Sequence, residues 1–420
     1  MDTAPVMETV SRWVQIPDRR GDFPSLLRTH NGKTLAYLDG PAGTQVPQQV
    51  IDAITQYYSS CNANTHGRFP TAAESDRMLD AARGAVAHFL GARGPACISF
   101  GANMTTLAYA LARAFARGLR PGDEVVITQL DHEANRGPWL SLAERGIVVR
   151  EVALRKDATL DEEDFARAVG PRTRLVAVGM ASNAFGTVNN IALAHDLARG
   201  AGALLLVDAV HYAPHFPLDV RGADVDLLLC SAYKFYGPHV GILYAREGLL
   251  DTLEPDRLRV QDQRGPWRIE TGTLNHAAIA GVAAAVEYIA TFGSGADFRS
   301  RIVSAMEAIG GHEHRLARLL YEGLLGIDHV TVHGPTFDVP RRAPTVSFTV
   351  DGMTAAGVSG RLGARGICTW DGNFYAVRPM EVLGLQAGGG VTRAGVSLYN
   401  SDEDVARLLA EVRDIARGRE

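Results

Sequence analysis

A lysine stands just past an apolar stretch of this 420-residue chain. The stretch Leu227–Ser231 is followed by Lys234, and a Gly237-Pro238 turn then breaks the chain. Burial at the mouth of a strand lowers the pKa of a lysine and frees its amine as a nucleophile, which suits a Schiff-base role. From this stretch alone, the alternative is a solvated lysine just beyond a strand.

Polar residues also stand at the ends of four other apolar stretches. The first runs into a small polar turn that opens a helix, and such a helix N-terminus either binds an anion or is only capped. His132 follows the second, as either a ring-stacking or a structural histidine. Asn183 follows the third, and Asp208 ends the fourth with His211 just beyond. A buried carboxylate such as Asp208 needs a cationic or hydrogen-bonding partner, unless it only caps the next helix.

These groups together match the needs of one cofactor. An anion cradle, a ring-stacking imidazole, a buried carboxylate and a lysine are what pyridoxal 5'-phosphate requires. Its phosphate takes the helix N-terminus, the lysine forms the Schiff base, and the carboxylate keeps the pyridine nitrogen protonated. The sequence therefore predicts pyridoxal phosphate as the cofactor and no metal.

The elements that must position these residues form an alternating pattern. From about residue 95 to 246, short apolar runs alternate with longer amphipathic ones, which is typical of a mostly parallel sheet with helices on both faces. Ligands of such a sheet bind beyond the carboxyl ends of its strands. We expect seven strands, the last antiparallel, at residues 96–100, 124–130, 148–154, 175–182, 204–209, 227–231 and 241–245, and a helix at 105–117 after the first.

The pattern changes after residue 293, which predicts a second, smaller α+β domain. A long helix is expected at residues 297–325 and a closing helix at 402–417, behind the capping signal at Ser401. Shorter strands are expected at 330–333, 345–350, 366–370 and 391–398. The predicted organisation is an N-terminal segment (1–33) that packs on the domains, a large cofactor-binding domain (34–293) and a small C-terminal domain (294–420).

Composition excludes several classes of protein. Hydrophobic residues make up 46% and charged residues 21%, as in an ordinary globular protein. The formal net charge of -5 gives no basic face for nucleic acid. We find no apolar stretch long enough for a bilayer and no signal-peptide pattern. The four cysteines are far apart, without a Cys-x-x-Cys pair, so we expect no zinc site or disulfide framework and a cytoplasmic location.

A family resemblance extends over residues 37–400, and seven fragments in order carry it. They are Asn62-Ala-Asn-Thr-His-Gly, Asp131-His-Glu-Ala-Asn, Ser182-Asn-Ala-Phe-Gly-Thr, Val207-Asp-Ala-Val-His, Ser231-Ala-Tyr-Lys, Glu270-Thr-Gly-Thr-Leu-Asn and Arg393-Ala-Gly-Val-Ser-Leu-Tyr-Asn. With them the chain resembles class V aminotransferases of the cysteine desulfurase and selenocysteine lyase group, within the fold-type-I pyridoxal phosphate enzymes. The resemblance implies this fold, this cofactor and a small amino acid as substrate.

The resemblance also implies roles for individual residues. Lys234 would hold the cofactor and move the α-proton, Asp208 would pair with the pyridinium, and His132 would stack on its ring. Asn183 would lie near the phenolic oxygen or the substrate, and His211 stands where desulfurases have a glutamine. The phosphate would be held by Ser231, Asn103, Met104 and Thr105. Thr273 would reach the phosphate of a neighbouring subunit, which implies a homodimer with shared sites, and Arg393 would grip the substrate α-carboxylate.

One family feature is missing from the sequence. Desulfurases carry a mobile cysteine that takes sulfur as a persulfide, but aligning the loop glycines here puts Tyr375 at that position. Cys368 falls within an expected strand and is predicted to be a core residue. Cys61 is either buried or near the site. Tyr375, His66 and Arg68 are candidate specificity residues, or only packing and loop residues.

The sequence thus predicts α,β-elimination, such as carbon–sulfur cleavage, on a small amino acid without a persulfide cysteine. Aminotransfer and epimerisation at Cα are the alternatives within the same chemistry. An alternative of another class is a binding protein that has lost catalysis. A carboxylate grip at Arg393 would be of little use to such a protein.

Overall fold

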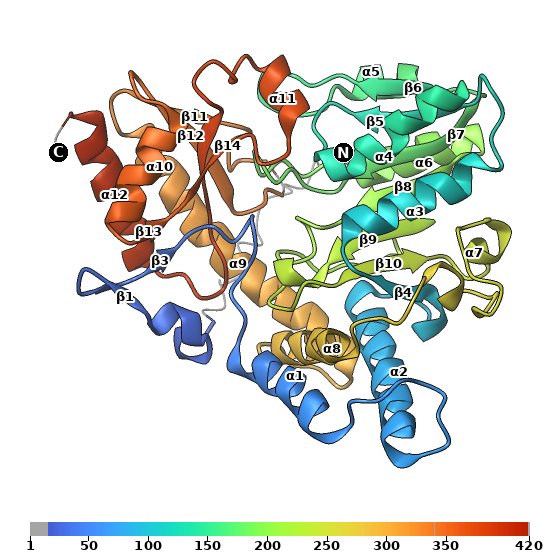
Figure 1. Cartoon of the computed structure of the whole chain (residues 1–420). Coiled ribbons are helices and arrows are strands. Elements are labelled where there is room, and N and C mark those ends of the chain that lie inside the picture. Colours follow the sequence, from blue (N-terminus) through green and yellow to red (C-terminus); the bar gives the residue numbers. More distant parts are fainter. Residues whose placement is uncertain (1–15, 340, 419–420) are drawn as a thin grey trace, which may run out of the picture.

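Seven strands form the large sheet of the computed structural model, which describes residues 16–339 and 341–418 (Figure 1). Their order across the sheet is β4 (Ile98–Gly101), β10 (Gly241–Ala245), β9 (Leu227–Ser231), β8 (Leu204–Asp208), β7 (Thr173–Gly179), β5 (Glu124–Thr128) and β6 (Val148–Val152). Only the pairs with β10 are antiparallel. The expected seven-stranded, mostly parallel sheet and its antiparallel 241–245 strand are confirmed.

Helices cover both faces of this sheet, because its strands point apolar side chains to both sides. Val125 and Ile127 of β5 belong to one core, together with residues of α3 and α4, whereas Val126 belongs to the opposite core. The helices around this sheet are α1 (Gln48–Ser60), α2 (Pro70–Leu90), α3 (Met104–Ala116), α4 (Gly137–Leu140), α5 (Glu162–Ala168), α6 (Ile191–Ala201), α7 (Leu249–Thr252) and α8 (His276–Ala290). In the part of the chain that the structure describes, no helix combines the length and apolarity needed to span a membrane.

A smaller sheet follows in the C-terminal part, as the sequence predicts, and its strands are antiparallel. Its order is β11 (Val330–His333), β12 (Thr345–Val350), β15 (Val391–Gly395) and β14 (Trp370–Gly372), and α10 (Ala355–Ala364), α11 (Val377–Val382) and α12 (Asp402–Ala416) accompany it. The single strand expected at 366–370 is instead two, β13 (Ile367–Cys368) and β14. The run divides because its halves have different partners: β13 pairs with β3 (Ala36–Tyr37), and β14 pairs with β15.

The long helix α9 (Phe298–Leu325) connects the two sheets (Figure 1). It starts at an Asp297 capping box and contacts α2 and α8 of the large unit as well as β11, β12 and α12 of the small one. Near the start of the chain, the buried Phe23 ring packs edge-on against Tyr236, Tyr288 and Tyr399. The described part of the N-terminal segment therefore packs on the rest of the chain, and residues 1–15 lie outside the described residues.

A buried ion pair fixes the stretch that leads from the sheet edge to α8. The Arg83 guanidinium of α2 donates to both carboxylate oxygens of Glu270, at 2.6 and 2.7 Å. Glu270 also accepts the backbone N–H of Phe100 at 2.6 Å. Removing one partner of such a pair leaves an uncompensated buried charge.

We therefore expect Arg83→Ala to lower the free energy of unfolding by about 3–5 kcal/mol. Urea denaturation followed by circular dichroism measures this effect. Arg93→Ala is the matched control, because Arg93 and Glu247 form an ion pair whose side chains are 79% and 60% exposed. We expect it to cost at most about 1 kcal/mol. Equal losses for the two variants would contradict the prediction.

Candidate active site

A cavity lies where the carboxyl ends of the parallel strands meet. It is lined by residues that follow five strands, β4, β5, β7, β8 and β9, as expected for a ligand site of an open sheet. The lining residues are Asn103, Met104, Thr105, Leu130, Asp131, His132, Ala134, Gly179, Ala181, Ser182, Asn183, Asn189, Asp208, Val210, His211, Ser231, Tyr233 and Lys234. Nine residues that the sequence singles out, from Asn103 to Lys234, thus surround one space.

Lys234 is buried at the base of this cavity, in a short turn directly after β9. Its Nζ donates to the carbonyl oxygens of Pro41 and Ala42, the second at 2.9 Å, and lies 4.9 Å from the centre of the Tyr233 ring. Burial, helped by the charge of Arg393, lowers the pKa of Lys234 to about 7. A large fraction of the amine is therefore unprotonated at neutral pH and able to act as a nucleophile.

Two buried carboxyl groups stand at the ends of β8 and β5, the two strands on either side of β7. Asp208 ends β8 and accepts the backbone N–H of Val210 at 2.9 Å, and burial raises its pKa to about 6. Asp131 follows β5 and accepts the backbone N–H of Gly179 at 2.7 Å, and burial together with the charge of Asp208 raises its pKa to about 7. Within the described residues Asp208 forms no ion pair. A bound cation would therefore stabilise its charged form.

His132 is a neutral ring on the same cavity. Its Nδ1 accepts the backbone N–H of Ala134 at 3.0 Å. Burial, with the charges of Lys234 and Arg393, lowers its pKa to about 4. A neutral imidazole that has lost its solvation shell is suited to stacking on an aromatic ligand rather than to pairing with an anion.

The turn before α3 has the features expected of an anion site. Asn103 caps the helix by accepting the N–H of Thr106 at 2.9 Å, and Ser231 Oγ accepts the N–H of Met104 at 3.1 Å. This turn lies directly on β10, because a Cβ on Gly241 would come within 2.3 Å of the Asn103 backbone. The first turn of the helix and the Ser231 hydroxyl therefore face the cavity together, where the helix dipole favours a negative charge.

A buried chain of polar groups lies next to His211, and sequence reasoning missed most of it. His211 Nε2 is hydrogen-bonded with Thr345 Oγ1 at 2.9 Å, while its Nδ1 is buried without a partner among the described residues. Its ring is 5.2 Å from that of His215, whose Nδ1 lies 2.7 Å from a carboxylate oxygen of Glu313. Burial lowers the pKa of His211 well below its ordinary value, so its free nitrogen is available to a ligand as a neutral group.

Arg393 lies close by but does not line the cavity. It is 2% exposed on β15 and donates to Asp39 Oδ1 and to the carbonyl of Asn183, each at 3.1 Å. Its guanidinium carbon lies 4.1 Å from the centre of the Phe374 ring. The sequence singles out Arg393, but it gives no sign of Asp39 as its partner.

Two hydrogen bonds hold the loop that carries Tyr375 next to the site. Asn183 Nδ2 donates to the Phe374 carbonyl at 2.9 Å, and the Glu133 N–H donates to the Tyr375 carbonyl at 2.8 Å. Phe374 and Tyr375 both have positive φ, 56° and 59°. The Tyr375 ring is 5.6 Å from that of His132, although the residue is 69% exposed. Two consecutive left-handed residues are costly, and such strain collects at ligand-binding loops.

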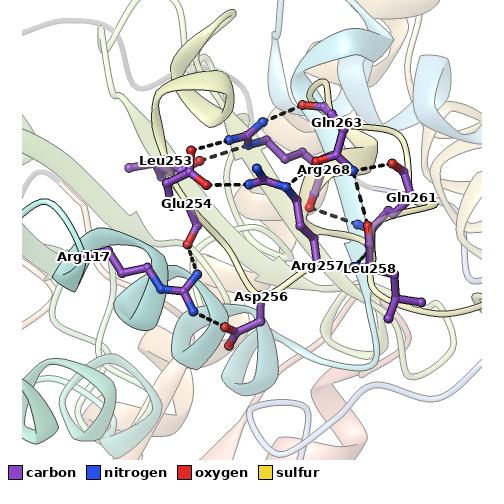
Figure 2. A network of polar contacts seen from close by, with 9 residues as sticks. All are labelled: Arg117, Leu253, Glu254, Asp256, Arg257, Leu258, Gln261, Gln263 and Arg268. Carbon is purple, nitrogen blue, oxygen red and sulfur yellow. Dashed lines mark hydrogen bonds and ion pairs between the residues drawn. The ribbon is translucent and has the colours of Figure 1, made fainter.

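Three of the residues that the sequence singles out lie away from the cavity of this single chain. Thr273, His66 and Arg68 are exposed. Thr273 follows a loop that is held by a network of polar contacts (Figure 2). In this network Arg268 donates to the Leu253 carbonyl at 3.0 Å and to Glu254 at 2.9 Å. Arg117 binds Asp256 in the same network. The role of Thr273 in a shared site and the roles of His66 and Arg68 in specificity stay predictions.

The residues around the cavity fit pyridoxal phosphate. Lys234 supplies an amine that loses its proton near pH 7, and Asp208 supplies a buried carboxyl with no ion pair among the described residues. His132 supplies a neutral ring, and α3 supplies a helix N-terminus suited to an anion. Sequence reasoning did not assign roles to Asp131 and Tyr233. Asp131 directly follows a buried strand, the same signal that marks Asp208, and Tyr233 adjoins Lys234.

Comparisons with known proteins agree with this geometry. The family model for aminotransferase class-V matches residues 36–408. A cysteine desulfurase from Salmonella gallinarum is 33% identical over 414 residues, which cover 95% of this chain and 97% of the relative. A solved apo cysteine desulfurase from Thermococcus onnurineus superposes with a TM-score of 0.87 at 28% identity, covering 96% of this chain and 99% of the other. One from Escherichia coli gives 0.82 at 28% identity, with 95% and 97% covered.

Proposed function

Because this chain belongs to the class-V aminotransferase family and is a pyridoxal phosphate enzyme, we propose that it cleaves the carbon–sulfur bond of a small amino acid by α,β-elimination, without a persulfide cysteine. With cysteine the balanced reaction consumes one water and yields pyruvate, ammonia and hydrogen sulfide. The observation that carries the proposal is that none of the four cysteines lines the cavity around Lys234.

The residues divide the work as follows. When bound, pyridoxal phosphate withdraws electrons from Cα, which acidifies its proton and weakens the bond to a β-substituent. Lys234 Nζ would hold the cofactor and move the α-proton, for which a pKa of about 7 is well matched to neutral pH. Asp208 would keep the pyridine nitrogen protonated, His132 would stack on the ring, and the start of α3 with Ser231 would hold the phosphate. Arg393 binds the substrate carboxylate.

The four cysteines are poorly placed to take sulfur from a substrate. Cys97 and Cys230 are buried, and burial raises the pKa of each thiol. Burial, together with the nearby charge of Asp39, also raises the pKa of the Cys368 thiol, which disfavours its thiolate. Cys61 ends α1 beside the Tyr57 cluster. A persulfide carrier must be an accessible thiolate next to the bound substrate. Cys97, Cys230 and Cys368 have raised thiol pKa values, and Cys61 does not line the cavity.

Product analysis tests the proposal. Holoenzyme is incubated with cysteine, selenocysteine and cysteine S-conjugates, and pyruvate, alanine and sulfide are followed. We expect pyruvate, because elimination leaves the carbon skeleton oxidised. Alanine would instead indicate desulfuration through a persulfide, and no turnover across a panel of amino acids would overturn the enzymatic claim.

The double variant Cys61→Ser/Cys368→Ala is the control for this experiment, because it removes both half-buried thiols. Pyruvate formation within about twofold of the wild-type rate is expected, since neither thiol lies on the reaction path. A much lower rate of pyruvate formation in the double variant would instead indicate a route through a persulfide.

A further inference from the structure

The guanidinium of Arg393 is already occupied by groups of this chain. One terminal nitrogen donates to Asp39 Oδ1 and the other to the Asn183 carbonyl, each at 3.1 Å. The Phe374 ring covers one face at 4.1 Å, and Nε is buried without a partner among the described residues. The Asp39 carboxylate thus stands where an anionic ligand of Arg393 would be expected.

Binding a substrate carboxylate to Arg393 while Asp39 is still paired with it is energetically unfavourable. The side chains of Arg393 and Asp39 are 2% and 13% exposed, so both charges lie in a medium of low dielectric constant. Two carboxylates on one buried guanidinium leave a net negative charge there, which burial strongly disfavours. Binding of a substrate carboxylate to Arg393 therefore requires Asp39 to leave or to become neutral.

We propose that Asp39 is an internal competitor for the substrate carboxylate: the incoming carboxylate takes Arg393 from Asp39, and Asp39 takes up one proton from solvent as it is released. The charge at the site then balances, since one carboxylate is paired with the guanidinium and the other is neutral. This inference rests on the proposed function, in which Arg393 binds the substrate carboxylate.

The surroundings of Asp39 favour that proton uptake. Besides Arg393, the titratable groups that face it are Tyr37, Lys234 and Cys368. Burial raises the pKa of Asp39 even with the pair intact, and Arg393 is the chief group that opposes the shift. Loss of Arg393 to a ligand therefore raises the pKa of Asp39 further. Binding takes up a proton at pH values between the two pKa values, and the affinity rises as the pH falls through that window.

The strained loop that carries Phe374 covers the same guanidinium. Phe374 is 8% exposed, and its carbonyl is held by the side chain of Asn183, whose own carbonyl accepts from Arg393. Phe374 also lies in a left-handed conformation that is unfavourable for a bulky side chain, so movement of the loop backbone, and not of the ring alone, would release that strain. Competition at Arg393 and movement of the loop are thus linked through Asn183.

Calorimetry on the holoenzyme tests the competition with propionate, a carboxylate that has no amine to react with the cofactor. Titrations at pH 7.5 in two buffers of different ionisation enthalpy give the number of protons taken up. We expect net uptake by the wild type and none by Asp39→Asn. We also expect the variant to bind propionate at least roughly fivefold more tightly, the lower end of coupling between linked sites.

Two further measurements keep the inference testable if the variant folds poorly. For the wild type alone, propionate affinity must rise as the pH is lowered from 8 to 6. If propionate binds the wild type and Arg393→Ala with equal affinity, Arg393 does not bind the carboxylate, and the proposed competition by Asp39 is wrong as well. If binding depends on Arg393 but a folded Asp39→Asn protein binds no more tightly, or the wild type takes up no proton, the competition alone is wrong and the proposed function stands.

Discussion

The Lys234→Ala protein is expected to lose turnover by a factor of about 10⁴, the upper end of what one positioned proton-transfer group contributes, because the same amine also attaches the cofactor. Two features of the structure carry this expectation. Lys234 is buried in the cavity at the end of β9, and its pKa of about 7 makes it at once a nucleophile and a base at neutral pH. No other lysine lines the cavity.

The attachment can be measured separately from turnover. The chain has three lysines, so borohydride reduction of the holoenzyme followed by peptide mapping gives a clear answer. We expect the label on Lys234 and on neither Lys33 nor Lys156, both of which are exposed. Lys156→Ala is the matched control and should keep the visible absorbance band of the bound cofactor. A reducible adduct in the Lys234→Ala protein would show that the lysine is wrongly assigned.

The sequence was sufficient to predict the sheet and most of the cavity, for a simple physical reason. Parallel strands end at one edge, so polar residues directly after buried runs come together there whatever the loops do. Asp208, Ser231 and Lys234 are such residues, and the structure brings them to one space. The strand boundaries at 227–231 and 241–245 agree with the structure because each run ends in a clear turn signal.

Contacts between residues far apart in the sequence could not be predicted in this way. Glu313 stands in the amphipathic pattern of α9 as one more charged residue, yet it is 1% exposed because His215 approaches from another element. Asp39 lies 354 positions from Arg393 along the chain. The split of the 366–370 run likewise depends on β3 and β15 offering separate edges. Only the tertiary fold creates these partners.

The pairing of Arg393 with Asp39 also changes how a substitution at Arg393 must be interpreted. Arg393→Ala removes a charge-assisted contact with the substrate, and losses of this kind are about 2–5 kcal/mol. That corresponds to a rise of roughly 30- to 4,000-fold in KM, with the cofactor still bound. The same substitution, however, leaves Asp39 as a buried carboxylate without its cation, which destabilises the protein on its own account.

A double variant separates the two effects. Arg393→Ala/Asp39→Asn has neither the guanidinium nor the orphaned carboxylate, so we expect it to recover much of the stability that Arg393→Ala loses. The KM is expected to stay high, because no group is left to bind the substrate carboxylate. Steady-state kinetics and thermal unfolding of both variants give the comparison. If the double variant recovered a wild-type KM, the defect of Arg393→Ala would come from the buried charge of Asp39, and Arg393 would have no part in holding the substrate.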